Sequence, residues 1–253
     1  MKQIIVNADD FGVNETVTSE IERMIEKECV TSTTVMANGK CLDEVKRFAA
    51  LHPEVSFGVH LCLSEFDSVT KSDGLFRAGL TDENGTFIKK AIFSLNNLEE
   101  ADVQKAVKEE LNAQIEVVKA LGIPVSHADS HHHVHTIYPL RKLFVEVLKE
   151  QGIGKVRLGI NFALHSRIHV KSWLHREWLN SLYRKNFVTT DAFYGYAGFV
   201  KDGYKHKREK VVELMCHPGH PAERYQSEMV LVQEGAHNSA KEAKLISYLD
   251  LHK

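Results

Sequence analysis

The chain has 253 residues, 43% of them hydrophobic, and a formal net charge of −2 at pH 7. This length suits one α/β domain spanning residues 1–253, and the near-neutral charge with scattered Lys and Arg argues against binding to nucleic acid or a membrane surface. With no apolar run near the roughly 18 residues of a spanning helix, no signal peptide and widely spaced cysteines, we expect a cytoplasmic protein.

Short runs rich in β-branched residues alternate with stretches of helical spacing. We expect strands over residues 3–7, 31–37, 55–63, 125–130, 155–160, 187–192 and 211–216. The clearest helical pattern covers residues 107–118, with Asn97 and Glu100 upstream like an N-cap and its N3 partner. This alternation predicts a largely parallel sheet of about seven strands, either a barrel or a doubly wound sheet.

The first predicted strand runs into Ala8-Asp9-Asp10-Phe11, just before Gly12. Neighbouring side chains on a strand point to opposite sides, so one Asp can bind a metal while the other transfers a proton. The alternative is that both carboxylates only cap the helix that follows. Whether the doublet is an active site therefore depends on which other residues accompany it.

Residues 64–97 interrupt the alternation with clusters of Ser, Asp, Asn and Gly. The segment is too long for an ordinary loop between a strand and a helix, and long loops at the catalytic face commonly form lids or binding walls. We therefore expect a lid or insertion here. Phe76 and Phe87 either offer flat surfaces to a ligand ring or anchor the segment, and anchoring is the more frequent role.

Histidines gather at the ends of two later strands. His60 lies near the end of the predicted strand 55–63, and residues 127–135 read HADSHHHVH. Imidazole and carboxylate together are ligands of catalytic divalent metals, and three protein ligands leave positions for water and substrate. A lone histidine on an apolar strand is more often a hydrogen-bonded core residue, but the company of the Asp doublet favours a metal site.

Consecutive histidines cannot all bind one ion, and two arrangements remain open. If the chain is extended, Asp129, His131 and His133 share a face. If it turns helical after Ser130, His131 and His135 come together instead. The spacing does not choose between them.

His217 follows the last predicted strand, in Cys216-His217-Pro218-Gly219. Pro218 ends the strand and fixes the turn, so the imidazole should project from the same edge of the sheet. An imidazole with a pKa of about 6.5 can protonate a leaving amine, but it can equally be a turn residue that hydrogen-bonds to the backbone.

The order of these motifs resembles the YdjC-like carbohydrate deacetylase family, which includes chitooligosaccharide deacetylases. The match rests on VNADDFG from Val6, VTSTT from Val30, GVHL from Gly58, HADSHHHVH from His127, FYG from Phe193 and MCHP from Met215. The resemblance implies a distorted, barrel-like (βα) fold. It also implies a metal-dependent hydrolase that removes N-acetyl groups from small N-acetylglucosamine oligosaccharides such as diacetylchitobiose and releases acetate.

The resemblance further implies roles for individual residues. The metal ligands would be Asp10, His60 and His131; the catalytic residues would be Asp9 as general base, His217 as general acid and Arg157 as the group that orients the base. The family implies one magnesium ion, whereas two imidazoles and one carboxylate favour zinc, manganese or cobalt. Related proteins often pair, so a homodimer is compatible with the resemblance.

Two other functions remain as alternatives. A metal-dependent phosphoesterase would usually need two ions about 3.5 to 4 Å apart and more bridging carboxylates. A non-catalytic metal-dependent sugar-binding or regulatory protein would not need Asp9 beside the ligand Asp10. A deacetylase therefore accounts for more of the motifs than either alternative.

Overall fold

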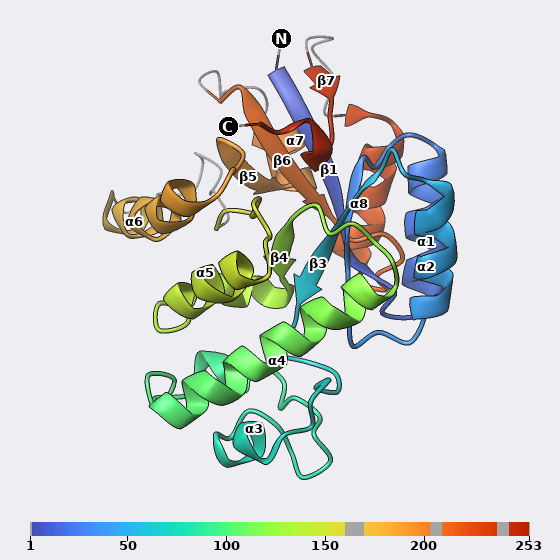
Figure 1. The fold of residues 1–253 in the computed structure, drawn as a ribbon. Helices are drawn as coiled ribbons and strands as arrows, with labels where there is room; N and C mark the ends of the chain where they lie inside the picture. Colours follow the sequence, from blue (N-terminus) through green and yellow to red (C-terminus); the bar gives the residue numbers. More distant parts are fainter. Residues whose placement is uncertain (1, 160–169, 203–208, 237–242, 253) are drawn as a thin grey trace.

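A computed structural model describes residues 2–159, 170–202, 209–236 and 243–252 (Figure 1). In this part of the chain the centre is a sheet with the strands β1 (Lys2–Phe11), β2 (Ser32–Val35), β3 (Ser56–Leu61), β4 (Ala128–Ser130), β5 (Ala192–Gly195), β6 (Val211–Cys216) and β7 (Ala243–Leu245). Their order is β4-β3-β2-β1-β6-β5, with β7 beside the start of β1, and these strand pairings are all parallel.

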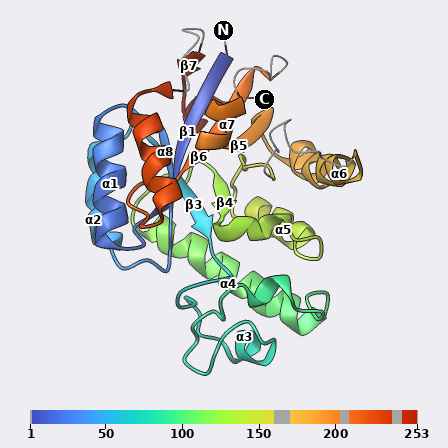
Figure 2. The ribbon, with the colours of Figure 1, turned by 180° about the vertical axis from the view of Figure 1, so that it is seen from behind.

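Helices surround the sheet, as the two opposite views show (Figures 1 and 2). The described α-helices are α1 (Glu15–Glu26), α2 (Leu42–Leu51), α3 (Asp73–Arg77), α4 (Ala101–Ala120), α5 (Arg141–Glu150), α6 (Val170–Asn186), α7 (Tyr196–Asp202) and α8 (Glu223–Gln233). In both views α1, α2 and α8 lie to one side, whereas α5 and α6 lie to the other. The sheet is mostly parallel and curled, which confirms the α/β class and the distorted (βα) barrel-like fold. No helix in the described ranges is both long enough and apolar enough to cross a membrane.

β1 lies at the centre of the sheet, between β2 and β6. Ile4, Val6 and Phe11 are fully buried, because neighbouring elements cover both faces of the strand. A continuous apolar run is typical of such a central parallel strand. The ring of Phe11 packs on Phe48 of α2 and Phe57 of β3, with centroid distances of 5.9 and 6.2 Å. This packing holds the acidic end of β1 in a fixed place.

The predicted strand over 155–160 is wrong in its extent. Lys155 and Val156 form only isolated parallel bridges, and residue 160 lies outside the described residues. Gly159 donates its N–H to the side-chain oxygen of Asn180 at 2.8 Å, and the Asn180 amide donates back to the Gly159 carbonyl at 3.4 Å. A side chain therefore takes the hydrogen bonds that a neighbouring strand would make. The bridges at Lys155 and Val156 still continue the parallel hydrogen bonding of the curled sheet from β4 to residue 188.

Two further sequence expectations need correction. The predicted strand over 187–192 is reduced to a bridge at residue 188 and the first residue of β5, Ala192, from which the regular strand runs on to Gly195. Helix α4 begins at Ala101 with Glu100 as its N-cap, not Asn97, and Glu100 makes no side-chain capping bond. Asn97 instead donates from its side-chain amide to the carbonyl of Ala78 at 3.3 Å, which links the end of the 64–97 segment to its middle.

The 64–97 segment contains α3 and the 3-10 helix η1 (Ala91–Phe93) and is fastened to α4. Glu110 of α4 is fully buried and accepts hydrogen bonds from the backbone N–H groups of Val69 and Thr70 at 2.8 and 2.9 Å. Phe87 is buried and anchors the segment, whereas the ring of Phe76 is half exposed. Whether the segment acts as a lid stays a prediction.

Candidate active site

A cavity of about 740 Å³ opens where the strands β1, β3, β4 and β6 end. Because the carboxyl ends of parallel strands meet at one edge, residues far apart in sequence come together here. The lining includes the predicted residues Asp9, Asp10, His60, His131 and His217. Arg157, the sixth predicted residue, is fully buried and lies behind Asp9.

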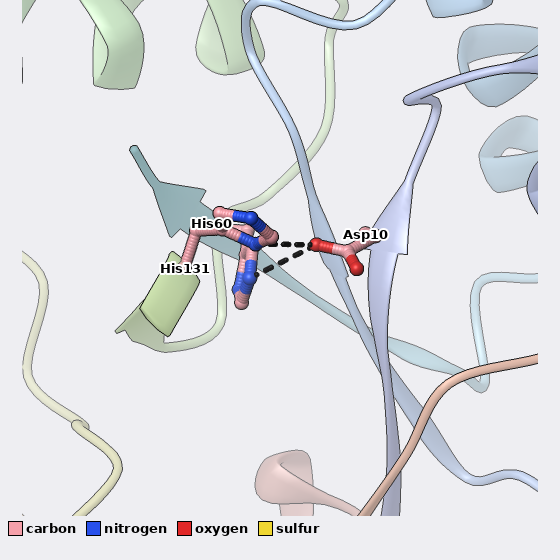
Figure 3. A group of neighbouring side chains, drawn as sticks. All are labelled: Asp10, His60 and His131. Atoms are coloured by element: carbon pink, nitrogen blue, oxygen red, sulfur yellow. Dashed lines mark hydrogen bonds and ion pairs between the residues drawn. The ribbon is translucent and has the colours of Figure 1, made fainter. Parts of the chain in front are cut away.

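The side chains of Asp10, His60 and His131 point toward one another (Figure 3). Asp10 Oδ1 lies 3.2 Å from His60 Nε2 and 2.9 Å from His131 Nδ1, and one potential ligand atom from each residue lies within 4.8 Å of the other two. Ligand atoms that share a zinc ion in a tetrahedral site stand roughly 3.4 Å apart. The spacing and the nitrogen and oxygen donors therefore fit a divalent metal.

Asp129, at the centre of β4, orients one of these candidate ligands. Its Oδ1 lies 2.6 Å from His60 Nδ1, so the carboxylate holds a proton on Nδ1 and leaves Nε2 facing Asp10. A metal-binding histidine almost always donates its second ring N–H to such an acceptor, which is a carboxylate, a backbone carbonyl or water. The motif containing Asp129 was recognised in the sequence, but this role was not, because it depends on the pairing of β3 with β4.

The charges of this group favour a cation. Burial would raise the pKa of Asp10, but hydrogen bonds from His131 and His60 hold it well below its ordinary value. Burial would lower the pKa of His60, but the carboxylates of Asp129 and Asp10 raise it well above its ordinary value. The carboxylates thus stabilise positive charge at this place, which a bound divalent ion would supply.

A β-bulge places both members of the Asp doublet in one cavity. The register of β1 with β2 shifts between Ala8 and Phe11, and Asp10 has a left-handed backbone with φ of 71°. Regular alternation, which we expected, would send the two carboxylates to opposite sides. Asp tolerates this conformation better than most residues, at a cost of about 1 kcal/mol. The capping alternative is wrong, because the side chain of Asn14 caps α1 by accepting from Val17 N at 3.0 Å.

Asp9 is held by a buried arginine. Arg157 donates from Nη1 and Nη2 to the two oxygens of Asp9, each at 2.7 Å, and the Asn7 amide donates to Asp9 Oδ1 at 2.9 Å. Arg157 Nη1 also lies 2.6 Å from Asp129 Oδ2, and its Nε donates to Glu213 at 2.7 Å. Burial would raise the pKa of Asp9, but Arg157 lowers it overall. Asp9 is therefore ionised near neutral pH.

His217 sits just after β6 and lines the same cavity. Its Nδ1 lies 4.0 Å from the carboxylate of Glu228, and its ring packs on Tyr225 with a centroid distance of 4.3 Å. Burial would lower the pKa of His217, but Glu228, Asp9 and Asp10 raise it overall. Its imidazole is therefore better able to carry a proton near neutral pH than an ordinary histidine.

The turn after His217 is held against α1. Gly219 has φ of +74°, and a Cβ atom there would lie 2.8 Å from the carbonyl oxygen of Thr16 and 2.8 Å from Cα of Val17. Only glycine combines this backbone conformation with so close an approach. The turn that carries His217 is thus fixed by contact with the helix that follows the Asp doublet.

Neither predicted arrangement of the histidine cluster describes the structure. The 3-10 helix η2 (His131–Thr136) begins after β4, and His132 and His133 both have left-handed backbones. His133 lines the cavity, and burial together with the charge of Arg157 lowers its pKa to about 3, so its imidazole is neutral. His135 is buried, with Nδ1 2.5 Å from the Ser130 hydroxyl, and is not a member of the groups of possible metal ligands found among the described residues.

Two other groups of possible ligands occur in the described residues. Asp9, His60 and Asp129 are close together, but Arg157 already lies against both carboxylates. The other group combines Glu65, His131 and His132 and shares His131 with the first site. Further cavity residues from the 64–97 segment, which sequence spacing did not reveal, are Glu65, Phe66, Lys89, Lys90 and Phe93.

Comparisons with known proteins show the family to which this chain belongs. The sequence model of the YdjC-like protein family matches residues 3–249. A protein of Oceanobacillus iheyensis named carbohydrate deacetylase is 29% identical over 218 residues, which are 86% of this chain and 85% of the relative. A crystal structure from Enterococcus faecalis V583, provisionally described as a cellobiose-phosphate cleavage protein, has a TM-score of 0.73 at 23% identity and 98% coverage of both chains. That last likeness shows the fold alone.

Proposed function

Because this chain belongs to the YdjC-like protein family, we propose that it is a metal-dependent carbohydrate deacetylase, which hydrolyses the N-acetyl group of an amino sugar and releases acetate. The name of the Oceanobacillus relative supports this class of reaction. The observation that carries the proposal is the convergence in one cavity of three ligand-type side chains, the carboxylate of Asp9 and the imidazole of His217.

Asp10, His60 and His131 would hold one divalent ion. Two imidazoles and one carboxylate favour zinc, manganese or cobalt over magnesium, which prefers oxygen ligands. When bound, such an ion supplies a Lewis acid that polarises a carbonyl and lowers the pKa of a bound water. Both the spacing of these side chains and the chemistry of their nitrogen and oxygen donors support this metal-binding role.

Asp9 would accept the proton of the attacking water. Arg157 keeps this carboxylate ionised, so it is free to take a proton in the resting enzyme. The bidentate contact also fixes the plane of the carboxylate, which lines the cavity beside Asp10. A positioned base of this kind contributes about 10²- to 10⁴-fold to the rate.

His217 would deliver a proton to the departing nitrogen. An amine is a poor leaving group unless it is protonated as the C–N bond breaks, so the acid is needed as much as the base. The raised pKa of His217 keeps more of this residue protonated near neutral pH. The products are acetate and a free amino sugar, with one C–N bond broken and one C–O bond formed.

The cavity is suited to a small sugar. Its volume of about 740 Å³ falls within the range of about 300 to 1,000 Å³ for ligand pockets. The rings of Phe66 and Phe93 line it and offer apolar surfaces to the faces of sugar rings. We therefore propose a short N-acetylglucosamine oligosaccharide, such as N,N′-diacetylchitobiose, as the substrate.

The test is acetate release from N,N′-diacetylchitobiose by protein stripped with a chelator and then supplied with each divalent ion in turn. We expect no release without metal and recovery with zinc, manganese or cobalt. The same preparations are assayed with p-nitrophenyl phosphate, since phosphate release would favour a phosphoesterase. If no ion restores acetate release, the proposed reaction with this substrate is wrong.

A further inference from the structure

Glu213 of β6 and Tyr248 lie behind the active site, at the far end of a chain of hydrogen bonds that reaches Asp9. We propose that Glu213 and Tyr248 are positioning residues, which hold Arg157 and through it orient the Asp9 carboxylate for deacetylation. The catalytic part of this inference rests on the proposed function, whereas the effect on Arg157 does not.

The chain of contacts is continuous and buried. The Tyr248 hydroxyl donates to Glu213 Oε2 at 2.5 Å, and Arg157 Nε donates to Glu213 Oε1 at 2.7 Å. The Nη atoms of Arg157 then contact both oxygens of Asp9 at 2.7 Å. Tyr248, Glu213 and Arg157 are fully buried and Asp9 is 2% exposed, so water cannot replace a lost partner easily.

Arg157 needs a third contact because two carboxylates compete for the same end of its side chain. Its Nη1 lies 2.7 Å from Asp9 Oδ2 and 2.6 Å from Asp129 Oδ2. The guanidinium is planar, so holding its Nε edge on Glu213 fixes the direction of both Nη atoms. The ring of Phe193 covers its face, 4.6 Å from Cζ to the ring centroid. Without Glu213, the group could turn toward Asp129 and away from Asp9.

The Tyr248 hydroxyl also favours the ionised form of Glu213. Burial raises the pKa of Glu213 to about 7, and the Arg157 guanidinium and the Tyr248 hydroxyl both oppose that rise. A glutamate ionised at this place attracts Arg157 more strongly than a protonated one. Loss of the Tyr248 hydroxyl would thus weaken the hold of Glu213 on Arg157.

The residues around Tyr248 are fastened at the opposite end of the sheet from the cavity. Tyr248 begins the 3-10 helix η5 (Tyr248–Asp250), which a capping box between Ser247 and Asp250 closes. The backbone N–H of Ile246 donates to the carbonyl of Ile4 near the start of β1 at 2.9 Å. The Tyr248 ring stacks flat on His127, with centroids 3.7 Å apart. The segment around Tyr248 is therefore linked to the active site through the buried side chains of Glu213 and Arg157.

Steady-state kinetics test the catalytic part with Glu213→Ala, Glu213→Gln and Tyr248→Phe. Loss of such a supporting group is expected to lower kcat about 10- to 100-fold in Glu213→Ala, with KM and metal content unchanged. Glu213→Gln keeps an acceptor for Arg157 Nε and should retain more of kcat, and Tyr248→Phe should lose less than Glu213→Ala. The double variant Glu213→Ala/Tyr248→Phe should be no slower than Glu213→Ala, because Tyr248 acts through Glu213.

Tyr183→Phe is the matched control for the lost hydroxyl. Tyr183 is also buried, but its hydroxyl donates to the backbone carbonyl of His135 at 2.5 Å instead of to a carboxylate that holds Arg157. Tyr183→Phe should keep the wild-type kcat. A merely structural role of Glu213 and Tyr248 would lower the melting temperature and leave kcat of the folded protein unchanged, and that result overturns the inference.

A measurement without substrate separates this inference from the proposed function. The Nε–H of Arg157, observed by ¹⁵N NMR and assigned by its loss in Arg157→Lys, should exchange slowly with water in the wild type. Exchange should be faster in Glu213→Ala and in Tyr248→Phe, but not in Tyr183→Phe. Unchanged exchange in both variants overturns the inference even if the wild type releases acetate. Faster exchange upholds the effect on Arg157 even if acetate release is never found.

Discussion

The substitution Asp129→Asn tests the link between the metal ligands and the buried arginine. Asp129 uses its two oxygens for different partners, since Oδ1 lies 2.6 Å from His60 Nδ1 and Oδ2 lies 2.6 Å from Arg157 Nη1. Asparagine has one carbonyl oxygen, so it can accept from His60 or from Arg157 but not in the same way from both. Whichever of His60 and Arg157 loses its acceptor then points an N–H group at the NH₂ group of the asparagine, so two buried donors face each other without an acceptor.

The expected magnitude follows from these two contacts. Loss of the carboxylate that orients a metal-binding histidine lowers metal affinity about 10- to 100-fold, which is roughly 1.4 to 2.7 kcal/mol. A buried donor without an acceptor costs about 1 to 3 kcal/mol of folding free energy, because it loses water and gains no partner. Asp129→Asn should therefore bind a divalent ion less tightly and unfold at a lower temperature than the wild type.

Zinc affinity is measured at fixed pH by competition with a chromogenic chelator, and thermal unfolding of the zinc-free proteins by circular dichroism. Glu228→Gln is the matched control, because Glu228 is a buried carboxylate that contacts His217 and is not within the group of candidate metal ligands. Its zinc affinity should equal that of the wild type. If Asp129→Asn binds zinc as tightly as the wild type, Asp129 does not orient His60 for metal binding and the reasoning is refuted.

Three further predictions concern the base, the acid and the turn that carries the acid. Asp9→Asn should lower kcat for acetate release about 10²- to 10⁴-fold while zinc content stays the same; a variant with normal release would eliminate Asp9 as the base. His217 must be protonated to act as an acid, so kcat should fall as pH rises through its raised pKa. Removing the Glu228 carboxylate lowers that pKa, so Glu228→Gln should move the alkaline limb of the pH–rate profile to lower pH, and an unmoved limb would argue against His217 as the acid. Gly219→Ala should lower the melting temperature more than Gly152→Ala does. Both glycines have a positive φ, which costs alanine about 1 kcal/mol, but of the two only Gly219 would bring a Cβ atom against the backbone of α1. Equal shifts of the melting temperature in the two variants would rule out this contact.

The sequence was most informative where burial and topology act together. β6 was predicted with its observed bounds, and β1, β2 and β3 overlap their predicted ranges, because buried strands of a parallel sheet are rich in β-branched and apolar residues. The same topology brings Asp10, His60 and His131 to one edge, since each lies at or just after the end of a different parallel strand. The order of residues thus predicts that these groups meet at one edge, whereas the choice of His131 within the histidine cluster came from the family resemblance.

Other features depend on contacts between distant residues and leave no local pattern. The bulge at Asp10 breaks the alternation on which the prediction for the Asp doublet depended. The strand predicted over 155–160 is reduced to bridges at Lys155 and Val156, and at Gly159 the side chain of Asn180 in α6 takes the backbone hydrogen bonds. Glu213 sits in an apolar run that looks like ordinary core, and Tyr248 lies 35 residues further on, so nothing in their spacing indicates that they meet.

The distribution of charge explains why these parts form one unit. Asp9, Asp10, Asp129 and Glu213 are four buried carboxylates, and Arg157 is fully buried beside three of them. Burying so many like charges costs free energy unless each has a partner. Arg157 contacts Asp9, Asp129 and Glu213, whereas the ion-pair partners of Asp10 among the described residues are His60 and His131. One guanidinium cannot neutralise three carboxylates, so the network keeps a surplus of negative charge, and Asp9 and Asp10 present that charge to the cavity, where a divalent ion can reach it.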